Sequence, residues 1–339
     1  MIQDAIKKVV EQHHLPEDEM SAVMNEMMEG ACSSVQMACF LTALRMKGET
    51  ADELIAAARV MRRKALNVPL INRIGLVDIV GTGGDGTHTF NISTAAAFVA
   101  SAAGLRVAKH GNRSVSSRSG SADVMEQLGI KITLTPEQVG RCIDETGIGF
   151  LFAPQFHLAM KHAAPVRRAI GIRTIFNMLG PLTNPADAEI QLIGVYDAKL
   201  APLFANVLER LGRKRALIVH GDDGVDELSI SAETLVYDLS PAGVTSYRLK
   251  PEDAGLARAA ADAVRGGDSA ANAGIILEIF KGARGPRRDT VVLNAGAAIM
   301  AGGLAKTIRD GAVLAAEAID SGRALRKLEL LQEFTHCLD

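Results

Sequence analysis

A run of glycines and hydroxyl side chains follows directly on a short apolar segment, Leu76–Val80. The glycines lie in Gly81–Gly86 (GTGGDG), where they would let the backbone approach an anion and offer it N–H groups. Thr89–Thr94 (TFNIST) then leads into an Ala-rich stretch that predicts a helix, and a helix N-terminus is a ready phosphate site. A plain strand-to-helix turn capped by Asn91 or Ser93 is the alternative. The lysine of GxxxxGK[ST] is missing, which argues against a P-loop nucleotide site.

A second polar loop follows the next predicted strand, which ends near Ala108. Lys109–Ser117 (KHGNRSVSS) supplies two cations, a histidine, an asparagine and three hydroxyls around a glycine. These groups suit a multiply phosphorylated ligand, with lysine as a point charge and hydroxyls as donors. A solvated polar loop is the alternative, but open α/β sheets bind ligands at the carboxyl ends of their strands. Ser121 opens a further helix nearby, and we expect it to act as a cap and a phosphate donor.

Carboxylates cluster after a third predicted strand, Ala216–Val219. The segment His220–Glu227 (HGDDGVDE) is acidic and has little basic compensation nearby. Mg²⁺ takes one or two carboxylates, keeps several waters and bridges to substrate phosphates. The alternative is an acidic surface turn, which would be the preferred interpretation if this segment were considered without the other loops. Beside two predicted phosphate loops, a metal site becomes the better interpretation.

Arginines occupy a fourth segment, Pro165–Arg168 (PVRR), upstream of Gly171–Thr174 (GIRT). A guanidinium here could pair with a substrate carboxylate through two parallel hydrogen bonds. Arginine on a helix surface is the alternative. His157 and His162 lie in the same region, and we interpret each as a packed or surface histidine rather than a catalyst.

The elements that must position these loops fall into two groups. Residues 1 to about 66 show helical periodicity only, and Thr50 with Glu53 forms a capping-box pattern there. From Leu76 onward, strand and helix patterns alternate, which predicts an α/β domain with a mainly parallel sheet. Strands are expected over Leu76–Val80, Leu105–Ala108, Gly149–Phe152, Ile190–Val195 and Ala216–Val219, with an antiparallel hairpin over Thr234–Asp238 and Val244–Leu249.

Composition limits the classes to which the chain can belong. Of its 339 residues, 48% are apolar and 22% charged, as in a globular protein with one large and one smaller domain. A net charge of -2 and 4% aromatics argue against a nucleic-acid partner. The four cysteines form no CxxC pair, so we expect neither a disulfide scaffold nor a zinc site. No membrane span or signal peptide is apparent, and a cytoplasmic protein is expected.

Four long motifs together resemble those of the anthranilate phosphoribosyltransferases. They are GTGGDGTHTFNIST (81–94), KHGNRSVSSRSGSADVMEQLG (109–129), FHLAMKHAAPVRRAIGIRTIFNMLGPLTNP (156–185) and HGDDGVDE (220–227). The resemblance runs in order from about residue 5 to 325. Pyrimidine nucleoside phosphorylases share the KHGNR…SGSAD stretch and are the nearest alternative, but the third and fourth motifs favour the transferase. A non-enzymatic or nucleic-acid-binding relative is disfavoured by the intact loops and the net charge.

The resemblance implies a fold, a reaction and partners. It implies a small helical domain (1–70, joined by helices from about 160–185), a large α/β domain (71–339) and an active site at the hinge. The family moves the phosphoribosyl group of 5-phosphoribosyl 1-pyrophosphate onto the amine of anthranilate, a step of tryptophan biosynthesis. Mg²⁺, with two ions per site, and a cytoplasmic homodimer are also implied, without a nucleic-acid or membrane partner. Any anthranilate synthase partner would be a separate chain.

Residue roles follow from the same resemblance, position by position. Mg²⁺ would be held by Ser93, Asp226 and Glu227, and anthranilate by Gly81, Asn112 and Arg167. His110 also lines the acceptor tunnel. An aromatic amine is neutral at pH 7 and needs no strong base, so no general base is assigned and His110 is only a candidate. The positions that match donor-binding residues are Gly81, Gly84, Asp85, Thr89, Asn91, Ile92, Ser93, Thr94, Lys109, His110, Gly111, Asn112, Arg113, Ser114, Val115, Ser116, Ser117 and Ser121.

Overall fold

Four helices form the start of the chain in a computed structural model that describes residues 1–114 and 119–338. They are α1 (Ile2–Val10), α2 (Glu17–Met28), α3 (Ser34–Lys47) and α4 (Ala51–Lys64). Helices α3 and α4 each begin with a capping box, which satisfies backbone N–H groups that a helix start leaves unpaired. In the described chain no strand precedes Leu76, so the expected all-helical start is confirmed.

A seven-stranded sheet forms the centre of the remaining chain, with strand order β3-β2-β1-β4-β5-β6-β7. Strands β1 to β5 pair in parallel, whereas β6 and β7 add an antiparallel hairpin at one edge. The mainly parallel sheet is therefore confirmed. The strands are β1 (Leu76–Gly81), β2 (Arg106–Gly111), β3 (Ile148–Phe152), β4 (Ile190–Gly194), β5 (Arg215–Gly221), β6 (Thr234–Ser240) and β7 (Gly243–Leu249).

Strand β2 continues further than the sequence indicates. We expected it to end at Ala108, but it stays in register with β3 through Gly111. The reason is that Lys109 and His110 are buried, at 1% and 5% exposure, and reach backbone carbonyl groups of neighbouring elements. These polar residues, which resemble a loop in the sequence, therefore belong to the end of a strand.

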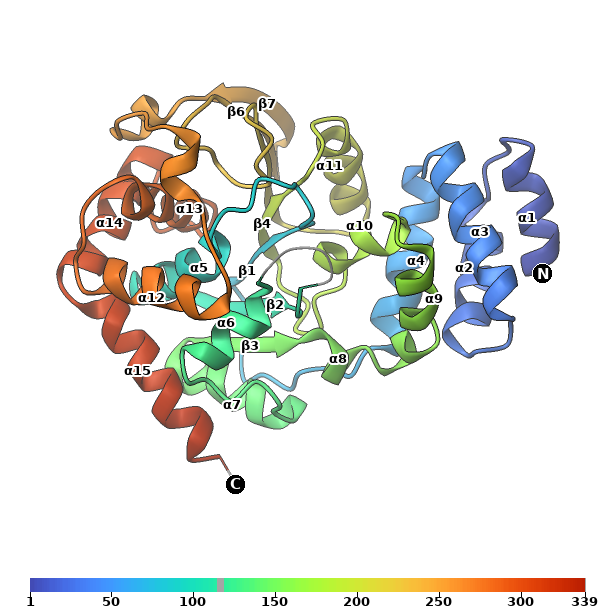
Figure 1. The fold of residues 1–339 in the computed structure, drawn as a ribbon, viewed down its shortest axis with the longest axis horizontal. Helices are drawn as coiled ribbons and strands as arrows, with labels where there is room; N and C mark the ends of the chain where they lie inside the picture. Colours follow the sequence, from blue (N-terminus) through green and yellow to red (C-terminus); the bar gives the residue numbers. More distant parts are fainter. Residues whose placement is uncertain (115–118, 339) are drawn as a thin grey trace.

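Helices cover both faces of the sheet (Figure 1). One face packs against α5 (Ile92–Ala102) and α13 (Pro286–Ala301), with α14 (Ile308–Asp320) and α15 (Arg323–His336) behind them. The other face packs against α11 (Leu200–Arg210), which adjoins α4. Three further helices are α6 (Ser121–Gln127), α7 (Pro136–Thr146) and α12 (Ser269–Phe280). None of the helices in the described residues is both long enough and apolar enough to cross a membrane.

The segment that follows β3 returns to the N-terminal helices. It contains α8 (Ala153–Phe156), the 3-10 turn η1 (Leu158–Lys161), α9 (Ala164–Ile170) and α10 (Ile175–Leu182). One hydrophobic cluster includes side chains of α2 to α4, α9, α10 and α11 together with one sheet face. We therefore propose a small helical domain made of residues 1–70 and about 160–185, with a hinge to the large α/β domain within 71–339.

Two facing glycines let the acidic segment cross the ends of the strands. Gly81, the last residue of β1, is in register with Gly194, the last residue of β4. A Cβ on Gly194 would lie 1.5 Å from the backbone oxygen of Asp226, and a Cβ on Gly81 would lie 2.4 Å from its carboxylate. Neither position therefore admits a side chain while Asp226 keeps its place.

Gly194→Ala should displace the Asp226 segment and lower the free energy of unfolding by roughly 1–3 kcal/mol, the usual cost of overpacking. Gly274→Ala in α12 is the matched control, because a Cβ there meets nothing within 4 Å. The control should be stabilised by about 0.4–1 kcal/mol. Urea denaturation measures both changes, and a Gly194→Ala variant as stable as the wild type would contradict the close approach.

Candidate active site

The glycine loop after β1 is anchored at its base and turned by positive φ angles. The Thr82 hydroxyl accepts a hydrogen bond from the backbone N–H of Tyr196 (3.0 Å). Gly83 and Gly84 have φ angles of 66° and 72°, which favour glycine. The backbone N–H of Gly83 donates to the Asp226 carboxylate (2.7 Å). The loop thus joins the acidic segment directly.

Helix α5 begins at the far end of this loop, and Asn91 does not cap it in the usual way. The Asn91 side chain makes no capping bond; its Oδ1 accepts from Asn272 Nδ2 (2.9 Å) and from the Ser119 hydroxyl (3.2 Å). The backbone N–H of Ser93 instead donates to the Glu227 carboxylate (3.1 Å). The first turn of α5 therefore already binds an anionic group, as helix N-termini do.

Lys109 is the cation at the centre of the site. Its Nζ donates to the carbonyl oxygen of Ile79 (2.7 Å) and lies 3.4 Å from the Ser93 hydroxyl. Burial lowers the pKa of this ammonium, while Asp78 and Glu227 act to raise it. The positive charge is thus held between β1, β2 and the start of α5.

The loop after β2 folds against the start of α6. The backbone N–H of Asn112 donates to the Ser121 hydroxyl (3.2 Å), so Ser121 fixes this loop. The cap of α6 is Gly120, whose N–H donates to Asp123 (2.9 Å); the expectation that Ser121 is the cap was therefore wrong. Arg113 pairs with Asp123 (2.8 Å) on α6. Three expected donor residues lie outside the described chain: Val115, Ser116 and Ser117.

Two of the carboxylates in 220–227 meet the glycine loop and the start of α5, through the hydrogen bonds from Gly83 and Ser93. Burial and the Asp85 carboxylate raise the pKa of Asp226, and burial and Asp226 raise the pKa of Glu227. Like charges held close together in a partly buried place produce such shifts. This pair would therefore be stabilised by a bound cation.

A magnesium ion fits this arrangement. The ion takes one or two carboxylates and completes its shell with waters and phosphate oxygens. Among the described residues, no group of three or more His, Cys, Asp or Glu side chains could hold a metal unaided. Asp226, Glu227 and the Ser93 hydroxyl are thus suited to an ion that a phosphorylated substrate helps to bind.

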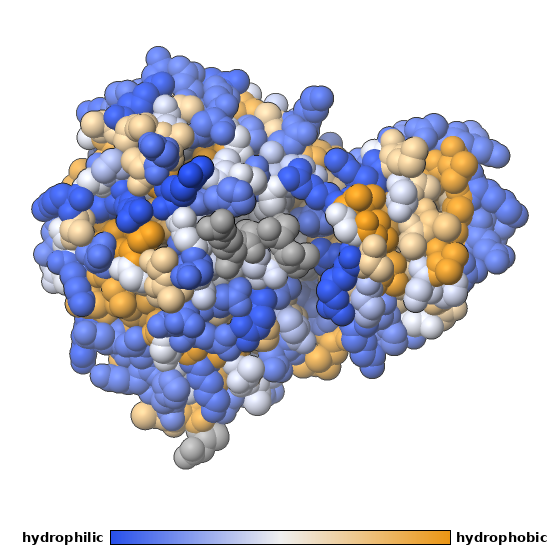
Figure 2. Space-filling model, in the orientation of Figure 1, coloured by the Kyte–Doolittle hydropathy of each residue, from blue (hydrophilic) through white to orange (hydrophobic). Residues whose placement is uncertain are grey.

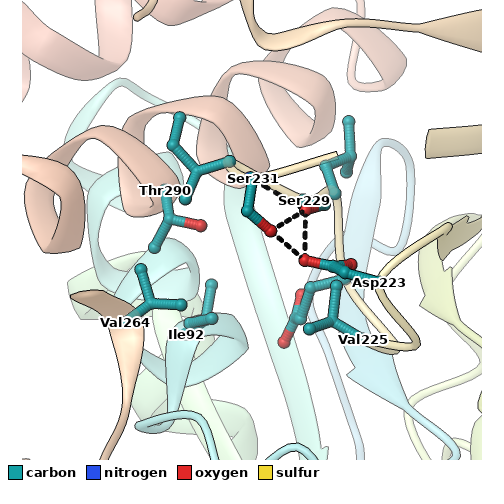
Figure 3. Close-up of a pocket in the computed structure, with 10 residues that line it drawn as sticks. Ile92, Asp223, Val225, Ser229, Ser231, Val264 and Thr290 are labelled. Atoms are coloured by element: carbon teal, nitrogen blue, oxygen red, sulfur yellow. Dashed lines mark hydrogen bonds between the residues drawn. The ribbon is translucent and has the colours of Figure 1, made fainter. Parts of the chain in front are cut away.

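The other two carboxylates of the acidic segment have structural partners. Asp222 pairs with Arg248 on β7. Asp223 accepts hydrogen bonds from the hydroxyls of Ser229 (2.7 Å) and Ser231, which close the loop on itself (Figure 3). A water-sized cavity of about 10 Å³ adjoins this cluster. The acidic segment therefore divides into a pair that braces the loop and a pair that faces the site.

Arg167 lies on α9 and is half-buried. Its guanidinium packs 5.4 Å from the ring centroid of Phe176, and burial lowers its pKa. Within residues 1–114 and 119–338, no carboxylate or carbonyl oxygen pairs with this guanidinium, and nothing bonds it to the phosphate loops. A half-buried arginine with free donors suits a carboxylate ligand. The neighbouring Arg168 is exposed.

Several residues that shape the site could not be recognised in the sequence. Arg173 donates to the carbonyl oxygen of Gly84, and its guanidinium lies 4.1 Å from the ring centroid of Tyr196. This contact links the segment between α9 and α10 to the glycine loop. Asn272, which donates a hydrogen bond to Asn91, could have been suspected from the sequence, because it is a lone amide in the mainly apolar helix α12. Conversely, the expected residues Ile92 and Thr94 have buried side chains.

His110 and His157 form a buried pair behind the site, with ring centroids 5.2 Å apart. His110 Nδ1 bonds the carbonyl oxygen of Gly180 (3.1 Å), which places the proton on Nδ1. Burial and the adjacent His157 lower the pKa of His110 to about 3, and burial lowers the pKa of His157 to about 4. Both rings are therefore neutral at pH 7, and His110 Nε2 has no hydrogen-bond partner in the described chain.

Acid should destabilise the protein through these two histidines. The unfolded chain binds their protons near pH 6.5, whereas the folded protein excludes them until about pH 3–4, so stability falls as the pH drops through this window. Each histidine should remove roughly 2 kcal/mol at pH 5 relative to pH 7.5. Urea denaturation at both values should show a smaller loss for His157→Gln. An identical loss in variant and wild type would refute the neutral pair.

A dinucleotide site is a structural alternative, because Gly81, Gly83 and Gly86 also satisfy GxGxxG and the order 3-2-1-4-5 of the first five strands is that of dinucleotide-binding folds. Such sites carry an acidic residue about 20 residues further on, which binds the ribose hydroxyls. Here the last three residues of β2 are Lys109, His110 and Gly111, none of which is acidic. The end of β2 therefore favours a phosphate ligand over a dinucleotide.

Comparison with known proteins agrees with this geometry. Residues 3–65 match the helical bundle domain of a glycosyl transferase family, and residues 73–325 match its a/b domain. The anthranilate phosphoribosyltransferase of Symbiobacterium thermophilum is 56% identical over 337 residues, which is 98% of this chain and 97% of that protein.

Two solved structures are similar over nearly the whole chain. The anthranilate phosphoribosyltransferase of Thermus thermophilus has a TM-score of 0.93 at 46% identity, over 98% of this chain and 100% of the other. That of Saccharomyces cerevisiae, in complex with PRPP and Mg, has a TM-score of 0.91 at 30% identity, over 99% and 98%. The chain belongs to the anthranilate phosphoribosyltransferases, within the glycosyl transferase family whose two domains it contains.

Proposed function

We propose that the protein transfers the phosphoribosyl group of 5-phosphoribosyl 1-pyrophosphate to the amine of anthranilate. The products are N-(5-phosphoribosyl)anthranilate and pyrophosphate, and the reaction belongs to tryptophan biosynthesis. The observation that carries this proposal is the meeting of Lys109, Ser93, Asp226 and Glu227 at the carboxyl ends of the strands. A magnesium-bound pyrophosphate calls for this combination of a cation, N–H donors and carboxylates.

The donor would bind along the glycine loop, the start of α5 and the loop after β2. As the C1–O bond breaks, negative charge develops on the pyrophosphate and positive charge on the ribose ring. Lys109 and the backbone N–H groups of the glycine loop would stabilise the leaving group from fixed positions. The hydrogen bonds among Asn91, Asn112, Ser119 and Ser121 support this placement, because they join the two loops and hold them before the substrate arrives.

Magnesium would be held by Asp226, Glu227 and Ser93, and we propose two ions per site. When bound, the metal neutralises charge on the leaving pyrophosphate. The raised pKa values of the two carboxyl groups support a cation here, because a cation would relieve the repulsion that raises them. The yeast relative in complex with PRPP and Mg supports it as well.

Anthranilate would bind with its carboxylate at Arg167 and its amine toward Gly81 and Asn112. The unpaired guanidinium supports this assignment, since a bidentate pair would also orient the ring. The neutral amine attacks C1 without a strong base, and its proton leaves once the new C–N bond forms. His110 is our candidate acceptor for that proton, because its neutral Nε2 has no partner in the described chain; its lowered pKa makes it a weak base.

We further propose a cytoplasmic homodimer, with any anthranilate synthase as a separate chain. Exposed apolar side chains on α1 and α3 support this proposal as candidates for a protein-covered face. Figure 2 shows apolar surface over these N-terminal helices. The exposed side chains include Val10 (62%), Val35 (72%) and Met46 (78%).

The function is tested by following the fluorescence of anthranilate in the presence of 5-phosphoribosyl 1-pyrophosphate and Mg²⁺. We expect a rapid loss that a chelator abolishes and that added Mg²⁺ restores. No loss from folded protein would contradict the proposal. Phosphorolysis of thymidine or uridine under the same conditions would instead indicate a pyrimidine nucleoside phosphorylase.

Arg167→Ala should raise the apparent KM for anthranilate by about 10- to 100-fold, because a charge-assisted pair contributes roughly 1.5–3 kcal/mol. The KM for the phosphoribosyl donor should change little. Arg168→Ala, which removes the exposed neighbour, is the matched control and should leave both constants unchanged. Equal increases in both constants for Arg167→Ala would indicate a hinge or folding role instead.

A further inference from the structure

We propose that Asn294 is a positioning residue for the metal-binding carboxylates, although it touches neither carboxylate. The inference rests on the proposed function, which assigns Asp226 and Glu227 to Mg²⁺. Asn294 lies in the middle of α13, is fully buried and faces the chain one residue beyond Glu227.

The Asn294 amide pairs with both backbone groups of Leu228. The backbone N–H of Leu228 donates to Asn294 Oδ1 (2.9 Å), and Asn294 Nδ2 donates to the carbonyl oxygen of Leu228 (3.0 Å). The second Nδ2 hydrogen is directed to the carbonyl oxygen of Thr290 (2.9 Å), one helical turn earlier. Both donors and the acceptor of the amide are thus satisfied without water, which fixes its orientation.

Leu228 lies between β5 and β6, outside either strand, and is fully buried. Its backbone N–H and C=O therefore have no strand partner and need the amide of Asn294. Buried backbone groups that lose their partner cost the full desolvation penalty. An apolar side chain at position 294 would fill space but leave the N–H and C=O of Leu228 unpaired. Asn294, a polar residue within an apolar stretch of α13, therefore stabilises the backbone directly after the acidic segment.

Helix α13 also supports the Glu227 carboxylate indirectly, through its packing against α5. It packs against α5, whose first turn holds Glu227 through the backbone N–H of Ser93 (3.1 Å). Glu227 is thus fixed at its carboxylate by α5 and at the adjoining peptide by Asn294. The loop is braced again at Asp223, and α13 supplies Thr290 to the cavity beside it (Figure 3).

Mg²⁺ binding should be sensitive to how firmly Asp226 and Glu227 are held in place. The ion demands near-ideal octahedral geometry, so small displacements of a ligand weaken binding. Residues behind the ligands typically change metal affinity by 10–100-fold when they are replaced. We therefore expect loss of the Asn294 amide to weaken metal binding without affecting the acceptor side.

The test measures Mn²⁺ binding by the EPR signal of the free ion, with pyrophosphate present and a protein-free titration subtracted. Asn294→Ala should weaken binding about 10-fold. Leu293→Ala, a packing loss at the next residue of the same helix, should stay within about twofold of the wild type. Asp226→Asn marks the effect of losing a ligand. In activity assays the Mg²⁺ concentration for half-maximal rate should rise in Asn294→Ala, while the KM for anthranilate stays unchanged.

Wild-type Mn²⁺ binding by Asn294→Ala would overturn this inference alone, since the metal assignment would stand. Equal weakening in Leu293→Ala would overturn it too, by showing that any loosening of α13 suffices. Absence of Mn²⁺ binding in the wild type would remove the metal assignment and the inference with it. If Asn294→Ala does not fold, Asn294→Ser replaces it, and wild-type binding by that variant would count against the proposal.

Discussion

The geometry of this protein depends on the close passage of one backbone over two strand ends. Gly81 and Gly194 face each other in register, and Asp226 lies directly over them. A side chain at position 194 would push the backbone of the acidic segment away from the sheet, and one at position 81 would displace the Asp226 carboxylate. Because the segment lies so close, the carboxylate of Asp226 reaches the N–H of Gly83 and the carboxylate of Glu227 reaches that of Ser93. Residues 143 and 134 positions apart in the sequence thereby meet at one site.

This packing brings together more negative charge than the nearby cation balances. Burial and the Asp85 carboxylate raise the pKa of Asp226, burial and the Asp226 carboxylate raise that of Glu227, and Lys109 is the buried cation beside Glu227. A bound metal ion would supply the missing positive charge, and it could bridge these carboxylates to the phosphates of a substrate.

The sequence predicts those parts of the site whose residues lie close together along the chain. Glycines and hydroxyls after apolar runs indicated the loops at 81–94 and 109–121, and alternating patterns indicated the parallel sheet. Lys109 and His110 read as loop residues, yet they extend β2 because buried partners satisfy them. The role of Gly194 could not be predicted, since it depends on a residue 32 positions later that only the fold brings near. The buried amides of Asn272 and Asn294 act through the same kind of distant contact.

The most direct test of this account is to locate the metal in a crystal of the protein grown with Mn²⁺ and pyrophosphate. Anomalous scattering identifies Mn²⁺ without reference to any assumed ligand. The account predicts a peak about 2 Å from carboxylate oxygens of Asp226 and Glu227, at the ends of β1 and β4, and in contact with the pyrophosphate. A peak that contacts neither carboxylate would contradict it, because the close passage over the two glycines would then serve the fold alone.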